Sequence, residues 1–171
     1  KLRRGQVPIY EPGLDELIRR NARQRRLAFA TSAAAGIRAA EVVFIAVGTP
    51  ALPDGEADLS QVKAVAREIG RHLNGAKVVV NKSTVPVGMG DLVASIIRGE
   101  RGGRHRCAVV SNPEFLREGS AVHDFMHPDR IVIGAADEKA AETVARLFRP
   151  LNAPILVTDV RSAEMIKYAS N

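Results

Sequence analysis

The chain has 171 residues, of which 46% are apolar and 26% charged, a balance that predicts one folded globular domain and argues against disorder. The net charge of +6 permits attraction to phosphate-bearing ligands, but aromatic residues make up only 4%, so we expect no nucleic-acid partner. No stretch approaches the ~20 apolar residues that a membrane span needs, and no apolar run near the N-terminus resembles a secretory signal.

Short runs rich in Val and Ile alternate with longer helical stretches along the chain. The runs predicted as strands are Leu27–Phe29, which is the weakest, and then Val42–Val47, Lys77–Asn81, Cys107–Ser111, Arg130–Gly134 and Ile155–Val157. Because these runs are continuous rather than alternately apolar and polar, they are typical of strands buried on both faces of a parallel sheet.

Helix start signals lie between these runs. Pro12 suits the first turn of a helix, and Asp58 is predicted as an N-cap with Gln61 as its capping-box partner. Asp137 precedes an Ala- and Glu-rich segment, and a last helix is expected over residues 162–171. The repeated strand–helix order predicts one α/β domain with a doubly wound parallel sheet.

Three consecutive predicted strands run into loops rich in Gly, Pro and hydroxyl groups. These loops are Gly48–Pro50, Lys82–Gly88 and Asn112–Gly119. If the strands are parallel, the loops meet at the carboxyl edge of the sheet, where ligands bind in this fold class. Thr49 and Thr84 place hydroxyls there, and Glu114 and Glu118 share one face if their stretch is helical.

Each loop also has an ordinary structural interpretation. Residues 48–50 form a common kind of turn, Lys82 to Thr84 can be a strand end and a helix cap, and two glutamates around Arg117 are more often a solvated surface than a general base. Only the shared position of the loops favours a polar ligand site.

Six stretches carry a resemblance to a known family. They are Pro8–Leu14, Phe44–Pro50, Lys82–Gly88, Ser111–Ser120, His127–Gly134 and Ser162–Asn171. Together they resemble the UDP-glucose branch of the UDP-glucose/GDP-mannose dehydrogenase family, over essentially the whole chain. The resemblance implies a Rossmann-like domain with NAD as cofactor, UDP-glucose as substrate and a homodimeric assembly. A GDP-mannose or other nucleotide-sugar 6-dehydrogenase, or a non-catalytic nucleotide-sugar binding module, remains the alternative.

The family oxidises the C6 alcohol of the sugar to a carboxylate in two successive hydride transfers to NAD+, here UDP-glucose to UDP-glucuronate. By resemblance, Glu114 is the general acid/base of the final hydrolysis, and Thr84 and Lys167 hold the reacting oxygen or a water. Asn171 joins Lys167 in stabilising negative charge.

The remaining residue roles concern binding and also rest on the resemblance. The predicted substrate-binding residues are Glu114, Phe115, Leu116, Arg117, Glu118, Lys167 and Asn171. Those predicted to approach NAD are Thr49, Thr84 and Glu118.

Lys167 and Asn171 are four residues apart, so on one helix their side chains point the same way. The alternative is a helix surface on which Lys167 pairs with Glu164.

Two parts of the family pattern are not found in the sequence. No Gly-x-Gly-x-x-Gly follows a strand, and we expect this turn, the first two strands and the acidic ribose ligand to precede Lys1. The catalytic cysteine is expected beyond Asn171. We therefore expect an incomplete, inactive chain, with an NAD-binding domain over residues 1–160 and the start of a central-domain helix over residues 161–171.

Other candidate groups are assigned structural roles. Cys107 opens an apolar strand, and we predict a small buried residue rather than a nucleophile. As the single cysteine it excludes an intramolecular disulfide and favours a reducing, cytoplasmic setting. His123 and His127 have helical metal-ligand spacing, but Pro128 interrupts the stretch, so no metal site is predicted.

Overall fold

The computed structural model describes residues 2, 6–100 and 105–171. Its centre is a five-stranded sheet in the order β1-β2-β3-β4-β5. The strands are β1 (Val42–Ile45), β2 (Lys77–Asn81), β3 (Cys107–Ser111), β4 (Ile131–Gly134) and β5 (Ile155–Thr158). The predicted α/β class with a Rossmann-like, doubly wound sheet is therefore confirmed.

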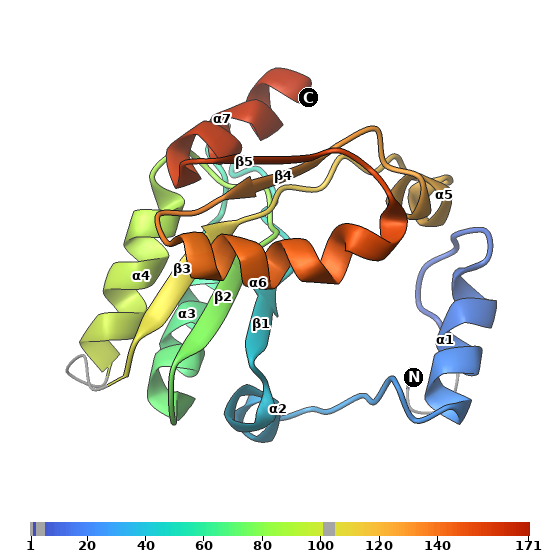
Figure 1. Ribbon diagram of the computed structural model, residues 1–171, viewed down its shortest axis with the longest axis horizontal. Helices are drawn as coiled ribbons and strands as arrows, with labels where there is room; N and C mark the ends of the chain where they lie inside the picture. The colour runs from blue at the N-terminus through green and yellow to red at the C-terminus, as the bar shows by residue number, and fades with distance from the viewer. Residues whose placement is uncertain (1, 3–5, 101–104) are drawn as a thin grey trace.

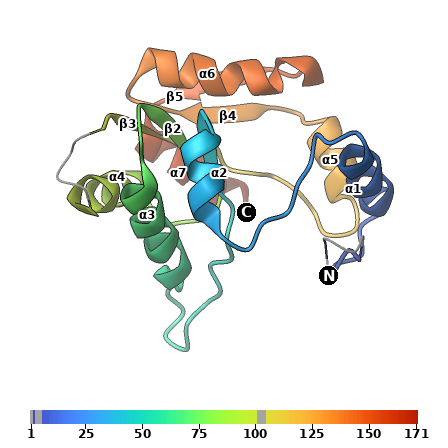
Figure 2. The same ribbon diagram turned by 90° about the horizontal axis from the view of Figure 1, so that it is seen from below.

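Helices cover both faces of this sheet (Figures 1 and 2). The described helices are α1 (Leu14–Arg23), α2 (Ala33–Ala39), α3 (Ser60–His72), α4 (Met89–Glu100), α5 (Ala121–Met126), α6 (Glu138–Phe148) and α7 (Val160–Ser170), with a 3-10 turn at Arg149–Leu151. One core lies between the sheet and α2, α3 and α4, and includes Ile45, Val79 and Val93. The second lies under α6, where Val110 and Ile133 contact Val144. Burial on both faces explains why the strand sequences do not alternate.

The strand directions differ in one place from an all-parallel sheet. β1, β2 and β3 are parallel to one another, as are β4 and β5, but β3 and β4 are antiparallel and their register pairs Ser111 with Gly134. The connection between them, residues 112–130, is mostly loop and holds one described helix, α5, of six residues. Gly134, the last residue of β4, lies beside Ser111, the last residue of β3, so the rest of β4 extends beyond the carboxyl end of β3.

The strand predicted at Leu27–Phe29 is wrong, because residues 27–31 form no strand in the structure. They belong to the connection between α1 and α2, and no strand of the described sheet lies beside them. A three-residue strand without a neighbour cannot satisfy its backbone N–H and C=O groups, so its propensity alone does not form it.

The helix starts show which cap predictions hold. Asp137 caps α6 by accepting from the N–H groups of Lys139 and Ala140, as predicted. The N-cap predicted at Asp58 is one residue early, because Leu59 takes the N-cap position of α3; the Asp58 carboxylate nevertheless accepts from Ser60 N–H at 2.8 Å. Pro12 lies outside its helix, because Gly13 takes a left-handed conformation and α1 begins at Leu14.

Helix α1 stands away from the sheet and lies beside α5 (Figures 1 and 2). The segment before it is attached by Glu11, whose carboxylate accepts from Gly119 N–H at 2.6 Å and from Ala121 N–H at 3.2 Å. Residues more than a hundred positions apart are thereby joined at the end of the loop that follows β3. No helix in the described part of the chain is long and apolar enough to cross a membrane.

Candidate active site

The carboxyl ends of β1, β2 and β3 bring the three predicted loops together. The Thr49 hydroxyl donates to the Thr84 carbonyl oxygen at 2.8 Å, which joins the first loop to the second. Lys82 donates to the side-chain oxygen of Asn112 at 3.1 Å, which joins the second to the third. The convergence predicted from parallel strands is confirmed.

Ser83 strengthens the first of these connections. Its hydroxyl accepts from Val47 N–H at 2.9 Å and donates to the Val47 carbonyl oxygen at 2.7 Å. One side chain therefore satisfies both backbone groups just beyond β1, where the ladder with β2 has ended. Sequence reasoning treated Ser83 only as part of a strand end, although a hydroxyl directly after a buried strand is a recognisable signal.

An ion pair joins α7 to the loop after β3. The Lys167 ammonium lies 2.9 Å from the Glu114 carboxylate and donates to the Glu114 backbone carbonyl oxygen at 2.6 Å. The side chain of Lys167 is 7% exposed and that of Glu114 is 29% exposed. The alternative pairing of Lys167 with Glu164 is wrong, since Glu164 accepts instead from the N–H groups of Gly88 and Gly90.

Glu114 is held in its charged form by its neighbours. Partial burial acts to raise its pKa, but the hydrogen bonds from Lys167 and from Leu116 N–H, together with the positive charges of Lys167 and Lys82, lower it further. The net effect is a pKa below the ordinary value for glutamate. A charged carboxylate accepts hydrogen bonds and is in the form that can act as a base.

Lys82 is a second positive group at the site. Burial lowers its pKa to about 8, opposed by the negative charge of Glu114 and assisted by the positive charge of Lys167. Its ammonium lies 5.9 Å from the ring centre of Phe125 and 5.5 Å from that of Phe148. A lysine that directly follows a buried Val-rich strand is the sequence signal for such a group, and it was not singled out.

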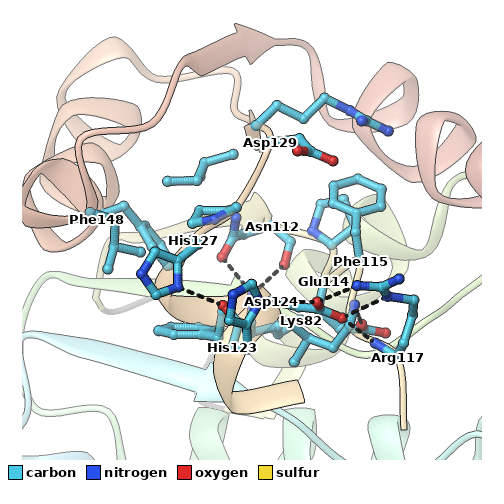
Figure 3. A pocket seen from close by; sticks show the side chains of 17 residues that line it. Lys82, Asn112, Glu114, Phe115, Arg117, His123, Asp124, His127, Asp129 and Phe148 are labelled. Carbon is cyan, nitrogen blue, oxygen red and sulfur yellow. Dashed lines mark hydrogen bonds and ion pairs between the residues drawn. The ribbon is translucent and has the colours of Figure 1, made fainter. Parts of the chain in front are cut away.

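A cavity of about 440 Å³ opens beside Lys82 and Glu114 (Figure 3). It is lined by Lys82, Asn112, Pro113, Glu114, Phe115, Leu116, Arg117, His123, Asp124, Phe125, His127, Pro128, Asp129, Arg130, Ile131, Phe148 and Leu151. Four of the predicted substrate-binding residues, at positions 114 to 117, line it. The cavity combines apolar walls with charged groups, as expected for a site that binds a polar ligand.

Two contacts shape the walls of this cavity. The Arg130 guanidinium lies 4.7 Å from the ring centre of Phe115 and donates to the Ser170 hydroxyl at 3.0 Å. Arg117 is paired with Asp124 at 2.7 Å, and hydrogen bonds from Arg117 hold the pKa of that aspartate far below its usual range. Arg117 is thus occupied by a neighbour on α5.

Other predicted site residues lie outside the cavity. Glu118 is exposed, and it does not share a helix face with Glu114 because residues 112–117 are not helical. Asn171 is exposed just beyond the last residue of α7, and its backbone N–H donates to the Lys167 carbonyl oxygen at 3.1 Å. Thr49 and Thr84 are half-buried on the neighbouring loops.

The histidines and the cysteine are accounted for structurally. The rings of His123 and His127 stack with centres 4.7 Å apart, and within residues 6–100 and 105–171 no group of three or more His, Cys, Asp or Glu is placed to hold a metal. Cys107 lies at the opposite end of β3 from the site, about 13 Å from Ser111, and burial raises its pKa to about 11.

The space beside β1 is open at the carboxyl edge. β1 is an outer strand of the described sheet, and its Phe44 is 39% exposed. Nothing lies within 4 Å of the position that a Cβ would take at Gly48, so an extended ligand can approach the backbone there. In doubly wound sheets, nucleotide ligands bind at this carboxyl edge, which places the chain among nucleotide-binding folds.

Comparison with known proteins narrows this class. Residues 1–152 match the NAD binding domain of the UDP-glucose/GDP-mannose dehydrogenase family. The chain is 55% identical over 170 residues to UDP-glucose 6-dehydrogenase TuaD of Bacillus subtilis, covering 99% of the chain and 37% of that protein. It is 52% identical over 177 residues to a UDP-glucose 6-dehydrogenase of Pseudomonas aeruginosa, covering 100% of the chain and 39% of that protein.

Solved structures agree. A UDP-glucose dehydrogenase from Pyrobaculum islandicum superposes with a TM-score of 0.95 at 50% identity, covering 99% of this chain and 40% of that one. A GDP-mannose dehydrogenase from Pseudomonas aeruginosa gives 0.93 at 36% identity, covering 98% of this chain and 40% of that one. The chain belongs to the UDP-glucose/GDP-mannose dehydrogenase family, and its cofactor is NAD. It spans well under half the length of these relatives.

Proposed function

We propose that the chain is part of an NAD-dependent UDP-glucose 6-dehydrogenase, which oxidises UDP-glucose to UDP-glucuronate in two successive hydride transfers at C6. The observation that carries the proposal is the buried Lys167–Glu114 pair beside the cavity. The identity of 52–55% to UDP-glucose 6-dehydrogenases supports the choice of sugar nucleotide.

The cofactor fits the residues present at the carboxyl edge. Thr49 and Thr84 lie on adjoining loops next to the open space at Gly48, where they would contact NAD, and Glu118 is proposed as a third contact. Bound NAD+ supplies the hydride acceptor. No Gly-x-Gly-x-x-Gly occurs in the sequence, so the residues here account for one side of the cofactor site.

The chain's own residues act on the sugar and its reacting oxygen. Lys167 would place a positive charge next to an alcohol oxygen as negative charge develops on it, and this stabilises the transition state. Glu114 would take a proton from water during the final hydrolysis, and Thr84 would orient that water or the reacting oxygen. Asn171 is proposed to assist Lys167.

Binding of the sugar nucleotide is proposed along positions 114 to 118. Phe115 and Leu116 would present their backbone groups and apolar surfaces to the ligand, and Arg117 and Glu118 lie at the exposed end of the loop. Arg117 already pairs with Asp124, so to contact the sugar nucleotide its guanidinium must either leave that pair or bind Asp124 and the ligand at the same time.

The reaction also requires a nucleophile for the second oxidation. Cys107 does not provide it, because its thiol lies at the wrong end of β3 and its pKa is raised to about 11 by burial. We propose that another part of the protein supplies this cysteine. A cytoplasmic location and a homodimeric state belong to the same proposal, and gel filtration of the full-length protein tests the dimer.

The proposed reaction is tested by its stoichiometry. Full-length protein incubated with limiting UDP-glucose and excess NAD+ should form about two NADH per sugar, since a four-electron oxidation needs two hydride transfers. Formation of one NADH per sugar would contradict the mechanism. The chain of 171 residues alone should give no steady turnover.

A second candidate substrate is GDP-mannose. The GDP-mannose dehydrogenase structure superposes almost as well as the UDP-glucose enzyme, although its identity to this chain is lower. Comparison of kcat/KM for the two sugar nucleotides separates them, and we expect UDP-glucose to be preferred. Binding of UDP-glucose without any NADH formation by the full-length protein would instead indicate a non-catalytic binding module.

A further inference from the structure

Glu164, on α7, is a buried carboxylate that the proposed mechanism does not use. Its residue is 2% exposed, and its two oxygens accept from Gly88 N–H at 2.6 Å and from Gly90 N–H at 2.7 Å. A charged group is rarely buried unless its hydrogen bonds are satisfied, and here both oxygens have a backbone donor. The two donors belong to one turn, which ends the Lys82–Gly88 loop and begins α4.

This turn is shaped to meet α7 closely. Gly88 has φ of 94°, a left-handed conformation that other residues rarely adopt. A Cβ at Gly90 would lie 2.5 Å from Cγ1 of Val160, so the start of α4 packs directly on the first turn of α7. The Glu164 carboxylate therefore fixes how the loop that carries Thr84 sits against α7.

The same helix also holds the other loop of the site. Lys167 lies three residues after Glu164, on the same side of α7. It donates hydrogen bonds to the carboxylate and to the backbone carbonyl oxygen of Glu114. Two buried charged groups on one helix thus each hold one loop, and the spacing between them is set by the rigid helix. A shift at Glu164 would move Thr84 relative to Lys167.

We propose that Glu164 is a positioning residue, which sets the place of Thr84 relative to the Lys167–Glu114 pair. This inference rests on the proposed dehydrogenase function. Around Glu164, the charged groups are Asp91 on α4 and Arg161 on α7, which pair with each other at 2.8 Å. Burial raises the pKa of Glu164 and the two backbone N–H groups oppose that rise, so the carboxylate depends on both of its donors.

The test is the substitution Glu164→Gln in the full-length protein. Glutamine can accept from one of the two N–H groups but places its own NH2 against the other. The turn that carries Gly88 and Gly90 is then held at one N–H instead of two, which shifts Thr84 from the Lys167–Glu114 pair, and we expect kcat to fall about tenfold or more. KM for UDP-glucose should change less than about threefold, because Glu164 does not contact it, whereas KM for NAD+ should rise, because Thr84 is a proposed NAD contact.

A matched control separates positioning from simple loss of charge. Glu138→Gln removes an exposed glutamate from the first turn of α6, away from the site, and should leave kcat unchanged. If Glu164→Gln lowers only Tm and leaves kcat at the wild-type value, the positioning role is wrong. Should Glu164→Gln not fold, Glu164→Asp keeps the charge and shortens the reach, and an unchanged kcat in that variant contradicts the proposal equally.

A double-mutant cycle with Thr84→Val tests the route of the effect. If Glu164 acts through the loop that carries Thr84, then Glu164→Gln should reduce kcat less than about threefold once the Thr84 hydroxyl is gone. Full additivity would show that Glu164 does not act through Thr84.

Hydrogen exchange gives a readout independent of activity. The Gly88 and Gly90 amides should exchange about tenfold faster or more in Glu164→Gln, and unchanged exchange would overturn the contact itself. If the wild-type protein does not oxidise UDP-glucose, the proposed function is wrong, and hydrogen exchange still tests the contact of Glu164 with Gly88 and Gly90 by itself. If it does oxidise UDP-glucose and Glu164→Gln matches it, only the positioning role fails.

Discussion

The Lys167 ammonium touches Glu114 twice, at the carboxylate (2.9 Å) and at the backbone carbonyl oxygen of the same residue (2.6 Å). The residues are 53 positions apart and belong to α7 and to the loop after β3. One contact fixes the backbone and the other fixes the side chain, so a residue on α7 sets the direction of the Glu114 carboxylate although Glu114 itself lies in a loop.

The first prediction concerns the coupling between these two residues. Lys167→Met leaves a partly buried carboxylate without its cation and should reduce the free energy of unfolding by about 2 kcal/mol. Glu114→Gln should cost less, since an amide oxygen still accepts from lysine. A double-mutant cycle by urea unfolding should give a coupling of about 1 kcal/mol or more.

The matched control is the ion pair between Arg71 and Glu100. Arg71 is 56% exposed, so the pair lies at the surface and its coupling should stay below about 1 kcal/mol. Equal coupling in the two cycles would contradict the importance of burial at Lys167.

The second prediction concerns the Thr49 hydroxyl. Thr49→Val removes the hydrogen bond to the Thr84 carbonyl oxygen, and we expect a loss of stability of about 1 kcal/mol with an increase in KM for NAD+. Thr143→Val is the control, since this threonine also donates to a backbone carbonyl at 2.8 Å but lies exposed on α6. Thr143→Val should leave KM for NAD+ unchanged. An equal rise of this KM in both variants would show that Thr49 has no specific role in binding NAD.

The third prediction concerns the pH dependence of Lys82. Its pKa in the folded state is about 8, below the usual 10.5, so between these values the unfolded chain binds more protons. Stability from this group therefore rises with pH across that window, by at most about 1.4 kcal/mol per pH unit. In urea unfolding, the free energy of unfolding of wild type minus that of Lys82→Met should increase from about pH 8 to about pH 10.

The exposed lysine Lys139 provides the comparison. Lys139→Met should give a difference from wild type that is constant over the same pH range. A constant difference for Lys82→Met would mean that the Lys82 ammonium is not destabilised by burial.

The fourth prediction contrasts two glycines. A Cβ at Gly134 would lie 2.5 Å from Cβ of Ala163 and 2.8 Å from the Asp159 carbonyl oxygen, so Gly134→Ala should destabilise the protein by about 1–3 kcal/mol. Gly36 lies in α2 with nothing within 4 Å of its Cβ position, and Gly36→Ala should stabilise by up to about 1 kcal/mol. Thermal unfolding of both variants measures the contrast, and an unchanged Tm for Gly134→Ala would argue against the close contact of β4 with α7.

Much of the fold was predictable because local signals agreed with tertiary packing. Val-rich runs became β2 and β3, and Asp137 capped α6, since burial on both faces and a free helix N-terminus leave little choice. Leu27–Phe29 failed for the opposite reason. Its weak apolar signal needed a neighbouring strand, and a sequence window contains no information on whether a neighbour is present.

The site was predicted in part. Parallel strand order was enough to place Thr49 near Thr84, but the partner of Lys167 could not be read from spacing, because Glu164 is closer in sequence while Glu114 is closer in space. The two residues meet because α7 packs against both β3 and β4, which brings Lys167 to the loop that follows β3. Lys82 was missed because burial of its ammonium comes from Phe125 and Phe148, which are distant in the chain.

The antiparallel junction divides the sheet into two parts, β1 to β3 and β4 to β5, which the described register joins at Ser111 and Gly134. Helix α7 contacts both β3 and β4 and lies across this seam. Glu114 extends from the first part, whereas Lys167 follows β5 and moves with the second. The second core also spans this seam, because Val110 of β3 and Ile133 of β4 both pack against α6. Sliding of one part against the other would therefore disturb that core and the Lys167–Glu114 contact together.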